Sequence, residues 1–205
     1  MKYLLQLGAL ALLITSSLTL QSPTFAAPPR RMHQRKTASS IIVPGKSIGT
    51  LRLGLDADRL PKSLGKSILG DGAAGHIWAT YRWDKGLLDI YSVLAEDGPH
   101  RARQLRTTSK AFHTKNGVAN GKSFGTIKRR FPHLTRLATY TSHRFGKRVV
   151  MYDDVKRGIA FEILRGRGRR VSNTNRCVSI LIHKPGSKAN QETLSPVNYP
   201  PLQTN

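Results

Sequence analysis

Cysteine and acidic side chains are scarce in this chain of 205 residues. Cys177 is the only cysteine, so no disulfide can form within the chain. Only 11 Asp and Glu residues accompany 34 Lys and Arg, which gives a formal net charge of +23. The fold must therefore rest on apolar burial and hydrogen bonding, and the surface is expected to attract anionic partners.

The spacings that mark metal sites and nucleotide sites are missing as well. None of the seven histidines stands four residues from another, or two to four residues from Cys177, so no zinc-site spacing is present. The tripeptide Gly-Lys-Ser begins at Gly45, Gly65 and Gly121, but none of these has the glycine five residues earlier that a phosphate-binding loop needs. We therefore expect no metal and no other cofactor, and we expect a protein that is not an enzyme.

Long apolar runs are confined to the start of the chain. Lys2 is followed by an apolar stretch from Leu4 to Leu20, and Thr24-Phe25-Ala26 places small residues at the −3 and −1 positions of a signal-peptidase site. The run from Leu10 to Ile14 is short against the ~20 residues that span a bilayer. Residues 1–26 are thus predicted to be a cleaved secretory signal peptide, with a secreted or periplasmic mature protein that has no transmembrane segment.

The charge is distributed unevenly along the chain. Residues 27–100 hold 11 Lys and Arg against seven Asp and Glu, whereas residues 101–188 hold 22 against three. Residues 27–40 and 189–205 are rich in proline and polar residues without apolar periodicity, which predicts a disordered basic arm and a disordered tail. The folded part is predicted to consist of one unit at 41–110 and a second, strongly basic unit at 111–188.

These two units look like repeats of each other. The segments 45–51 and 121–127 share five of seven residues, but setting Gly54 on Gly121 gives the better physical match. That alignment pairs a helix N-cap residue, an i, i+4 apolar pair and a helix terminator in both units. The aligned residues are Asp56 with Ser123, Leu60 with Ile127, Leu64 with Phe131, and Gly65 with Pro132.

Strand-like segments follow each predicted helix. Alternation of apolar residues indicates strands at 77–83, 87–94 and 104–108 in the first unit, and at 149–152, 158–164 and 178–183 in the second. The predicted fold class is α+β: a tandem repeat of a helix plus an antiparallel β-meander, with the helices packed on one face of the sheet.

The opening of the first unit resembles a known class of sequences. Residues 44–54, Pro-Gly-Lys-Ser-Ile-Gly-Thr-Leu-Arg-Leu-Gly, are similar to the start of a class of secreted bacterial proteins of unknown function. The pattern is more remotely similar to the BamE outer-membrane assembly lipoproteins and the beta-lactamase inhibitory proteins, which are built from helix-plus-meander units. The resemblance implies a fold and no chemistry. The chain lacks the lipidation cysteine of the BamE family, and no inhibitory contact residue can be carried over.

Arginine side chains are the candidate site residues. The Arg-Gly stretch from Arg165 to Arg170 is typical of a loop whose guanidinium groups meet phosphates or carboxylates. The predicted anion-binding residues are Arg129, Arg130, Arg165, Arg167, Arg169 and Arg170. The expected partner is an acidic envelope polymer, an anionic lipid or an acidic protein, with extracellular nucleic acid as a further candidate. The alternative is that the charge serves only solvation.

Two other functions remain open from the sequence. Residues 172–178 resemble the nucleophile region of the L,D-transpeptidases, which suggests a cell-wall-active hydrolase or transferase that uses Cys177. The chain departs from that family because Arg176, and not glycine, precedes the cysteine. The third reading is an inhibitor of another exported protein. The leading prediction is an exported, non-enzymatic binding protein of the cell envelope or extracellular space.

Overall fold

A computed structural model describes residues 40–83, 86–96, 98–142, 144–166 and 170–190. The predicted signal peptide, all but the last residue of the predicted arm and residues 191–205 of the predicted tail lie outside these ranges. Arg167 and Arg169 also lie outside them. All described residues belong to the unit Arg35–Asn205.

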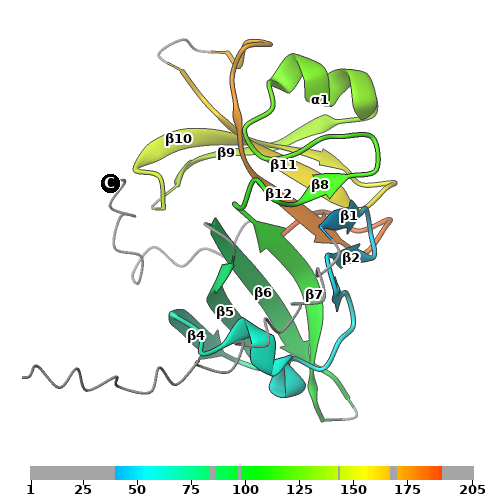
Figure 1. The fold of residues 1–205 in the computed structure, drawn as a ribbon, viewed down its shortest axis with the longest axis vertical. Coiled ribbons are helices and arrows are strands. Elements are labelled where there is room, and N and C mark those ends of the chain that lie inside the picture. The colour runs from blue at the N-terminus through cyan, green and yellow to red at the C-terminus, as the bar shows by residue number, and fades with distance from the viewer. Residues whose placement is uncertain (1–39, 84–85, 97, 143, 167–169, 191–205) are drawn as a thin grey trace, which may run out of the picture. The chain divides into compact units, whose positions relative to one another are not determined.

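An antiparallel sheet of eight strands forms the main element of the fold (Figure 1). It consists of two four-stranded meanders, which join where the last strand of each pairs with the other through Ile182 and Leu105. In spatial order the strands are β4 (Leu69–Ala73), β5 (His76–Trp83), β6 (Gly86–Leu94), β7 (His100–Thr107), β12 (Cys177–His183), β11 (Ile159–Leu164), β10 (Lys147–Asp154) and β9 (Thr135–Ser142).

A smaller sheet and three short helical elements complete the described structure. The small sheet has the order β3 (Leu51–Arg52), β2 (Ser47–Ile48), β1 (Ile41–Val43) and β8 (His113–Thr114), with β1 and β8 parallel. The helical elements are the 3₁₀ turns η1 (Ala57–Arg59) and η2 (Lys62–Leu64) and the α-helix α1 (Phe124–Arg130). Among the described residues, no helix has the length and apolar character needed to cross a membrane.

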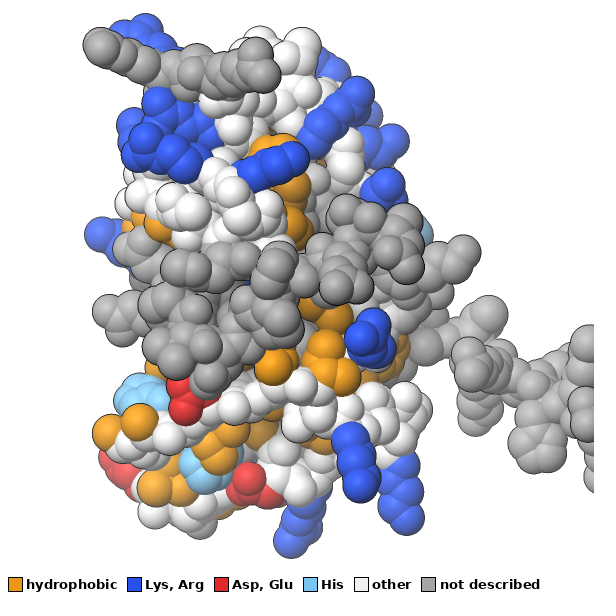
Figure 2. Space-filling view, turned by 90° about the vertical axis from the view of Figure 1, so that its left-hand side faces the viewer, with side chains coloured by type: hydrophobic (Ala, Val, Ile, Leu, Met, Phe, Trp, Pro, Cys, Tyr) orange, Lys and Arg blue, Asp and Glu red, His pale blue; other side chains and the backbone are white. Residues whose placement is uncertain are grey.

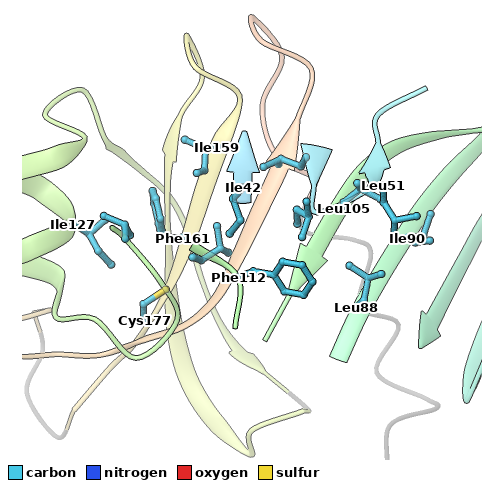
Figure 3. Close-up of a cluster of buried hydrophobic side chains, with 14 of the residues drawn as sticks. Ile42, Leu51, Leu88, Ile90, Leu105, Phe112, Ile127, Ile159, Phe161 and Cys177 are labelled. Carbon is cyan, nitrogen blue, oxygen red and sulfur yellow. The ribbon is translucent and has the colours of Figure 1, made fainter. Parts of the chain in front are cut away.

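The main hydrophobic core lies on one face of the large sheet (Figure 3). Side chains from both meanders, including Leu105 and Phe161, meet Ile42 from the small sheet and Ile127 from α1. The inward positions alternate along the strands, as in Ile159, Phe161 and Ile163, which are all fully buried. Because this one core draws on both meanders, the two halves of the sheet are held together by apolar burial.

The opposite face of the sheet carries a second, smaller apolar cluster and many buried polar groups. Met151, Leu181 and Ala189 pack together there. The Gln104 side chain donates to the carbonyl of Asn190 (2.9 Å) and accepts from its N–H (2.8 Å), so residues 189 and 190 lie against this face.

The predicted fold class was wrong. The structure is mostly β, with one seven-residue α-helix in the described ranges, and it is not an α+β repeat of helices packed on a sheet. The helix expected from Asp56 to Leu64 is replaced by two 3₁₀ turns. Pro61 explains this break, because proline disfavours helical backbone at the preceding residue, and Leu60 is indeed extended (ψ 149°).

The second predicted helix exists but is short. The Ser123 hydroxyl caps α1 by accepting from the Thr126 N–H, and Ile127 and Phe131 are buried as the apolar pair required. Phe131 leaves the helical conformation directly before Pro132, for the same steric reason that breaks the first helix.

Each of the six predicted strands overlaps a strand of the large sheet, but the two edge strands β4 and β9 were not predicted. All of β4 after Leu69 is exposed, and only the last residue of β9 is buried. An edge strand with little buried surface has little of the apolar alternation on which sequence-based prediction depends, and β4 also contains two glycines.

Candidate anion-binding site

The carboxylates of residues 101–188 all point into the protein. Asp153, Asp154 and Glu162 are at most 1 % exposed. On the face that Figure 2 shows, Lys and Arg side chains lie on the upper part and at the lower edge, whereas Asp and Glu side chains lie only on the lower part. In contrast to the three buried carboxylates, sixteen Lys and Arg side chains of residues 101–188 are exposed. They are Arg103, Lys110, Lys115, Lys122, Lys128, Arg129, Arg130, Arg136, Lys147, Arg148, Lys156, Arg157, Arg170, Arg176, Lys184 and Lys188.

Four cationic residues lie on neighbouring chain segments at one end of the large sheet. The Arg165 N–H donates to the Arg148 carbonyl (2.9 Å), and the Leu164 N–H donates to the Arg176 carbonyl (2.9 Å). The Cys177 N–H in turn donates to the Lys122 carbonyl (2.9 Å). Adjacent segments in such a ladder are about 4.8 Å apart, so the four backbone positions span roughly 15 Å. We call Lys122, Arg176, Arg165 and Arg148 the basic row.

Local backbone structure places the segment before α1 beside the start of β12. Gly121 has a positive φ of 86°, and its N–H donates to the Cys177 carbonyl (2.9 Å). Ser123 and Arg176 then form an isolated antiparallel bridge, and an Arg176 Nη1 donates to the Gly121 carbonyl (3.4 Å). Lys122 is thereby fixed next to Arg176, although 54 residues separate them in the sequence.

The cations of the basic row and the acidic residues of the same strands differ in exposure. Lys122, Arg148 and Arg176 are exposed and Arg165 is partly buried, while the nearest acidic residue on these strands, Glu162, is 0 % exposed and engaged inside the sheet. Like charges on adjacent strands repel each other, so this end of the sheet stores a repulsion that a bound polyanion would relieve.

The predicted arginines fall into two separate groups. Arg165 belongs to the basic row, and Arg170 is exposed in the loop between β11 and β12. Arg129 and Arg130 lie at the opposite end of β11, because Arg157, just before that strand, donates from Nη1 to the Arg130 carbonyl (3.1 Å). Six residues of extended strand, roughly 20 Å, separate the two groups.

A structural role is sufficient to account for Arg129 and Arg130. Both stand in the last turn of α1, where positive side chains favour the helix dipole. The Arg129 Nη2 also donates to the Thr126 hydroxyl (3.3 Å) on the same helix. Sequence reasoning missed Lys122, Arg148 and Arg176 because they lie far from one another in the sequence, and only the hydrogen bonds between segments bring them beside Arg165.

A buried charge cluster links the two meanders on the polar face of the sheet. Arg106 on β7 pairs with Glu162 on β11, and Arg144, in the turn after β9, makes two hydrogen bonds of 2.9 Å with Asp89 on β6. Arg106 Nη1 is also 3.6 Å from Asp89. Each meander thus supplies one arginine and one carboxylate, and each carboxylate is bound by an arginine of the other meander.

Hydroxyl groups saturate the two carboxylates of this cluster. Thr80 donates to Asp89 (2.8 Å), and both Ser179 and Tyr140 donate to Glu162. Burial, together with the adjacent Glu162 carboxylate, raises the pKa of Tyr140, so its hydroxyl stays protonated and can donate. All four carboxylate oxygens have protein partners, so the cluster acts as an internal brace between the halves. The sequence signal was an acidic residue inside an apolar strand, as at Asp89 and Glu162.

The serines of two Gly-x-Ser-x-Gly sequences, which begin at Gly45 and Gly121, have structural contacts. Ser47 lies in β2, where it pairs with Arg52 of β3. The Ser123 hydroxyl caps α1 and lies 3.0 Å from the Thr126 hydroxyl. The described contacts of both serines are therefore those of strand and helix-cap residues.

Cys177 lies in the main core. A register shift in the β11–β12 pairing, between Glu162 and Ile163, places Cys177 opposite the core residue Ile163. The thiol is 2 % exposed, and its S–H donates to the Ser179 carbonyl (3.1 Å). Burial raises the pKa of the Cys177 thiol well above its usual range, with a further contribution from Glu162. These surroundings disfavour the thiolate that a nucleophile needs.

We expect Cys177 to be protected from thiol reagents in the folded protein. Labelling with a maleimide at neutral pH should be more than about 100-fold slower than in denaturant, because exposing a core residue requires local or global opening. Mass spectrometry against time measures both rates. Native labelling at the rate of a free thiol would show that Cys177 is accessible and would restore the hydrolase or transferase reading.

The comparisons with known proteins give no relative from which to transfer a function. No protein-family model, no curated protein and no solved structure matches the chain. Across the described ranges, no group of three or more His, Cys, Asp or Glu side chains is arranged to hold a metal ion.

Proposed function

We propose that the protein acts outside the cytoplasm as a non-enzymatic binding protein that contacts an acidic partner through its basic second half. One observation carries the proposal: all three carboxylates of residues 101–188 are buried, while sixteen cations are exposed. A surface with one sign of charge attracts polyanions and speeds their encounter. Ordinary solvation would be served equally well by a mixture of acidic and basic side chains.

The basic row is the proposed centre of this contact. Its three arginines can each form paired hydrogen bonds with a phosphate, sulfate or carboxylate group, whereas Lys122 supplies a point charge. Because the four residues are attached to hydrogen-bonded neighbouring segments, their backbone positions are fixed before a ligand arrives. A chain-like polyanion can therefore contact several of them together without ordering the protein backbone.

Neutralising the basic row should weaken binding to polyanions. The variant carries Lys122→Gln, Arg148→Gln, Arg165→Gln and Arg176→Gln, and binding is measured against anionic vesicles, polyglutamate, teichoic-type polymer and single-stranded DNA in a salt series. For the class of polyanion that the wild-type protein binds, we expect the affinity of the variant to be lower by at least ~100-fold at physiological salt. The slope of log affinity against log salt should fall by about 3, since each phosphate contact contributes ~0.7 to 0.9.

A matched control removes the same charge from the other half. Arg52, Arg59, Lys62 and Lys66 are exposed, and replacing all four with glutamine lowers the net charge equally. We expect the affinity of this variant to fall by less than about 5-fold, because the four removed charges attract the ligand only from a distance and salt screens that attraction. Equal losses in the two variants would assign binding to net charge alone. Tight one-to-one binding to a protein that persists at high salt would favour the inhibitor reading instead.

A further inference from the structure

The strand β4 is an open edge of the large sheet. Among the described strands it pairs only with β5, from Leu69 opposite Thr80 to Ala73 opposite His76. In an antiparallel pair, alternate residues of an edge strand direct their N–H and C=O groups away from the partner. One such donor, the Gly72 N–H, is held by the Asp71 carboxylate (2.8 Å), an exposed contact that an incoming strand can replace.

The opposite edge of the sheet is protected and β4 is not. Strand β9 carries the exposed Arg136, and its pairing with β10 shifts register between Met151 and Tyr152. A charged side chain and an irregular ladder are the usual means by which proteins keep edge strands from pairing. Strand β4 has no lysine, arginine or proline, and its one charged residue is Asp71. Its pairing from 69 to 73 runs without a shift.

The positive charge of the chain opposes the meeting of two copies least at β4, whose one charged side chain is Asp71. Residues 67–81 contain no Lys or Arg, in a chain with 34 of them. The basic row begins at Lys122, beside β12 on the side of β7, so three strand spacings, or roughly 14 Å, separate it from β4. That exceeds the Debye length of ~8 Å at physiological salt, so two copies meeting at β4 are screened from each other's basic row.

One exposed apolar side chain precedes β4 directly, and a second lies on β6 beside the turn that follows β4. Ile68 and Leu94 are 40 % and 48 % exposed, and they are two of the three exposed large hydrophobic residues in the described ranges. The Ile68 N–H donates to Thr80 next to the start of β4, while the Leu94 N–H donates to Gly75 in the turn that follows β4. A strand laid along β4 would cover apolar surface as well as complete backbone hydrogen bonds.

We propose that β4 pairs with β4 of a second copy of this chain. The two strands run antiparallel about a twofold axis, which gives an isologous interface and one continuous sheet of sixteen strands. The basic rows then lie in the outer halves of that sheet, one on each side of the interface. The proposal is independent of what the basic row binds, because it rests on the edge, its charge and its apolar flanks.

Sedimentation velocity of the purified protein at physiological salt, over a range of concentrations, tests the proposal. We expect wild type to be a dimer and the double variant Ile68→Lys, Gly70→Lys to be a monomer. A Cβ at Gly70 has room, since its nearest neighbour is the Trp78 carbonyl oxygen at 3.5 Å. The control variant Thr135→Lys, Thr141→Lys adds the same charge to the exposed edge β9 and should remain a dimer.

Three results would overturn this dimer: a monomeric wild type, a dimer that survives in the β4 variant, or dissociation of both variants alike. Hydrogen exchange on wild type provides a readout that does not depend on how the variants fold. Amides of residues 69–73 should become at least 10-fold more protected as concentration rises through the dimer range, while those of β9 stay unchanged. Protection of β4 that is independent of concentration would also rule the interface out.

Discussion

Arg106→Ala is expected to lower the free energy of unfolding by about 3–5 kcal/mol, which is the usual cost of removing one partner from a buried ion pair. Arg106 is 1 % exposed and bonds Glu162 and Ser179 across the junction of the two meanders. Its removal leaves the Glu162 carboxylate buried without its counter-charge. Urea denaturation, fitted as a two-state transition, measures the change.

The same strand provides the control. Arg103 also lies on β7 but is exposed, so Arg103→Ala should change stability by less than ~0.5 kcal/mol. The double variant Arg106→Met, Glu162→Leu removes both charges and should recover most of the loss, because an apolar pair needs no compensation for a buried charge. If Arg106→Ala lowered the free energy of unfolding as little as Arg103→Ala, the buried charge cluster would contribute nothing measurable to stability.

Gly158→Ala should destabilise the protein by about 3 kcal/mol or more. Gly158 has a φ of 69°, and a Cβ there would lie 2.3 Å from the His183 carbonyl oxygen and 3.0 Å from the Gly45 Cα. The Gly158 carbonyl also accepts from the N–H groups of Gly45 (3.1 Å) and His183 (3.0 Å). An added methyl group must therefore separate three chain segments, in addition to the ~1–2 kcal/mol strain of left-handed backbone.

Gly146→Ala separates these two contributions. Gly146 has a similar φ of 58°, but a Cβ there would have no atom within 4 Å. Its substitution should cost only the ~1–2 kcal/mol of backbone strain. Thermal or urea unfolding of both variants gives the difference, which is the packing penalty at Gly158. Equal losses would mean that the three segments can move apart without cost.

The sequence was informative where structure depends on near neighbours. Alternation of Ile159, Phe161 and Ile163 predicted both a strand and its buried face. The same alternation would put Cys177 on the face opposite Ile180 and Ile182, but the register shift in the β11–β12 pairing moves it onto the core face with them. Alternation within one strand cannot reveal how a partner strand shifts it. The helix predicted from Asp56 is missing for a local reason, since Pro61 divides the segment into two 3₁₀ turns.

Local sequence patterns predicted even less of the candidate site than of the fold. The run from Arg165 to Arg170 is visible in the sequence as a basic loop. Lys122, Arg148 and Arg176 become part of one site only through the hydrogen bonds between neighbouring segments. The brace of Arg106 with Glu162 likewise depends on β7 and β12 meeting at the centre of the sheet. Such pairings join residues far apart in the chain, and no local pattern specifies them.

The order of synthesis differs from the order of the strands in space. Strand β12 is the last strand made in the described chain, yet it lies at the centre, between β7 and β11. A nascent chain that ends before residue 177 therefore lacks the strand that joins the first meander to β11 in the sheet. Leu105 on β7 can pair across the centre of the sheet only when Ile182 on β12 has been made. Contacts so distant in sequence form slowly, on the order of milliseconds to seconds, so we expect the large sheet to be completed only after residues 177–183 are made. Such a delay is compatible with the proposed export, because a chain that is still unfolded can be carried across a membrane.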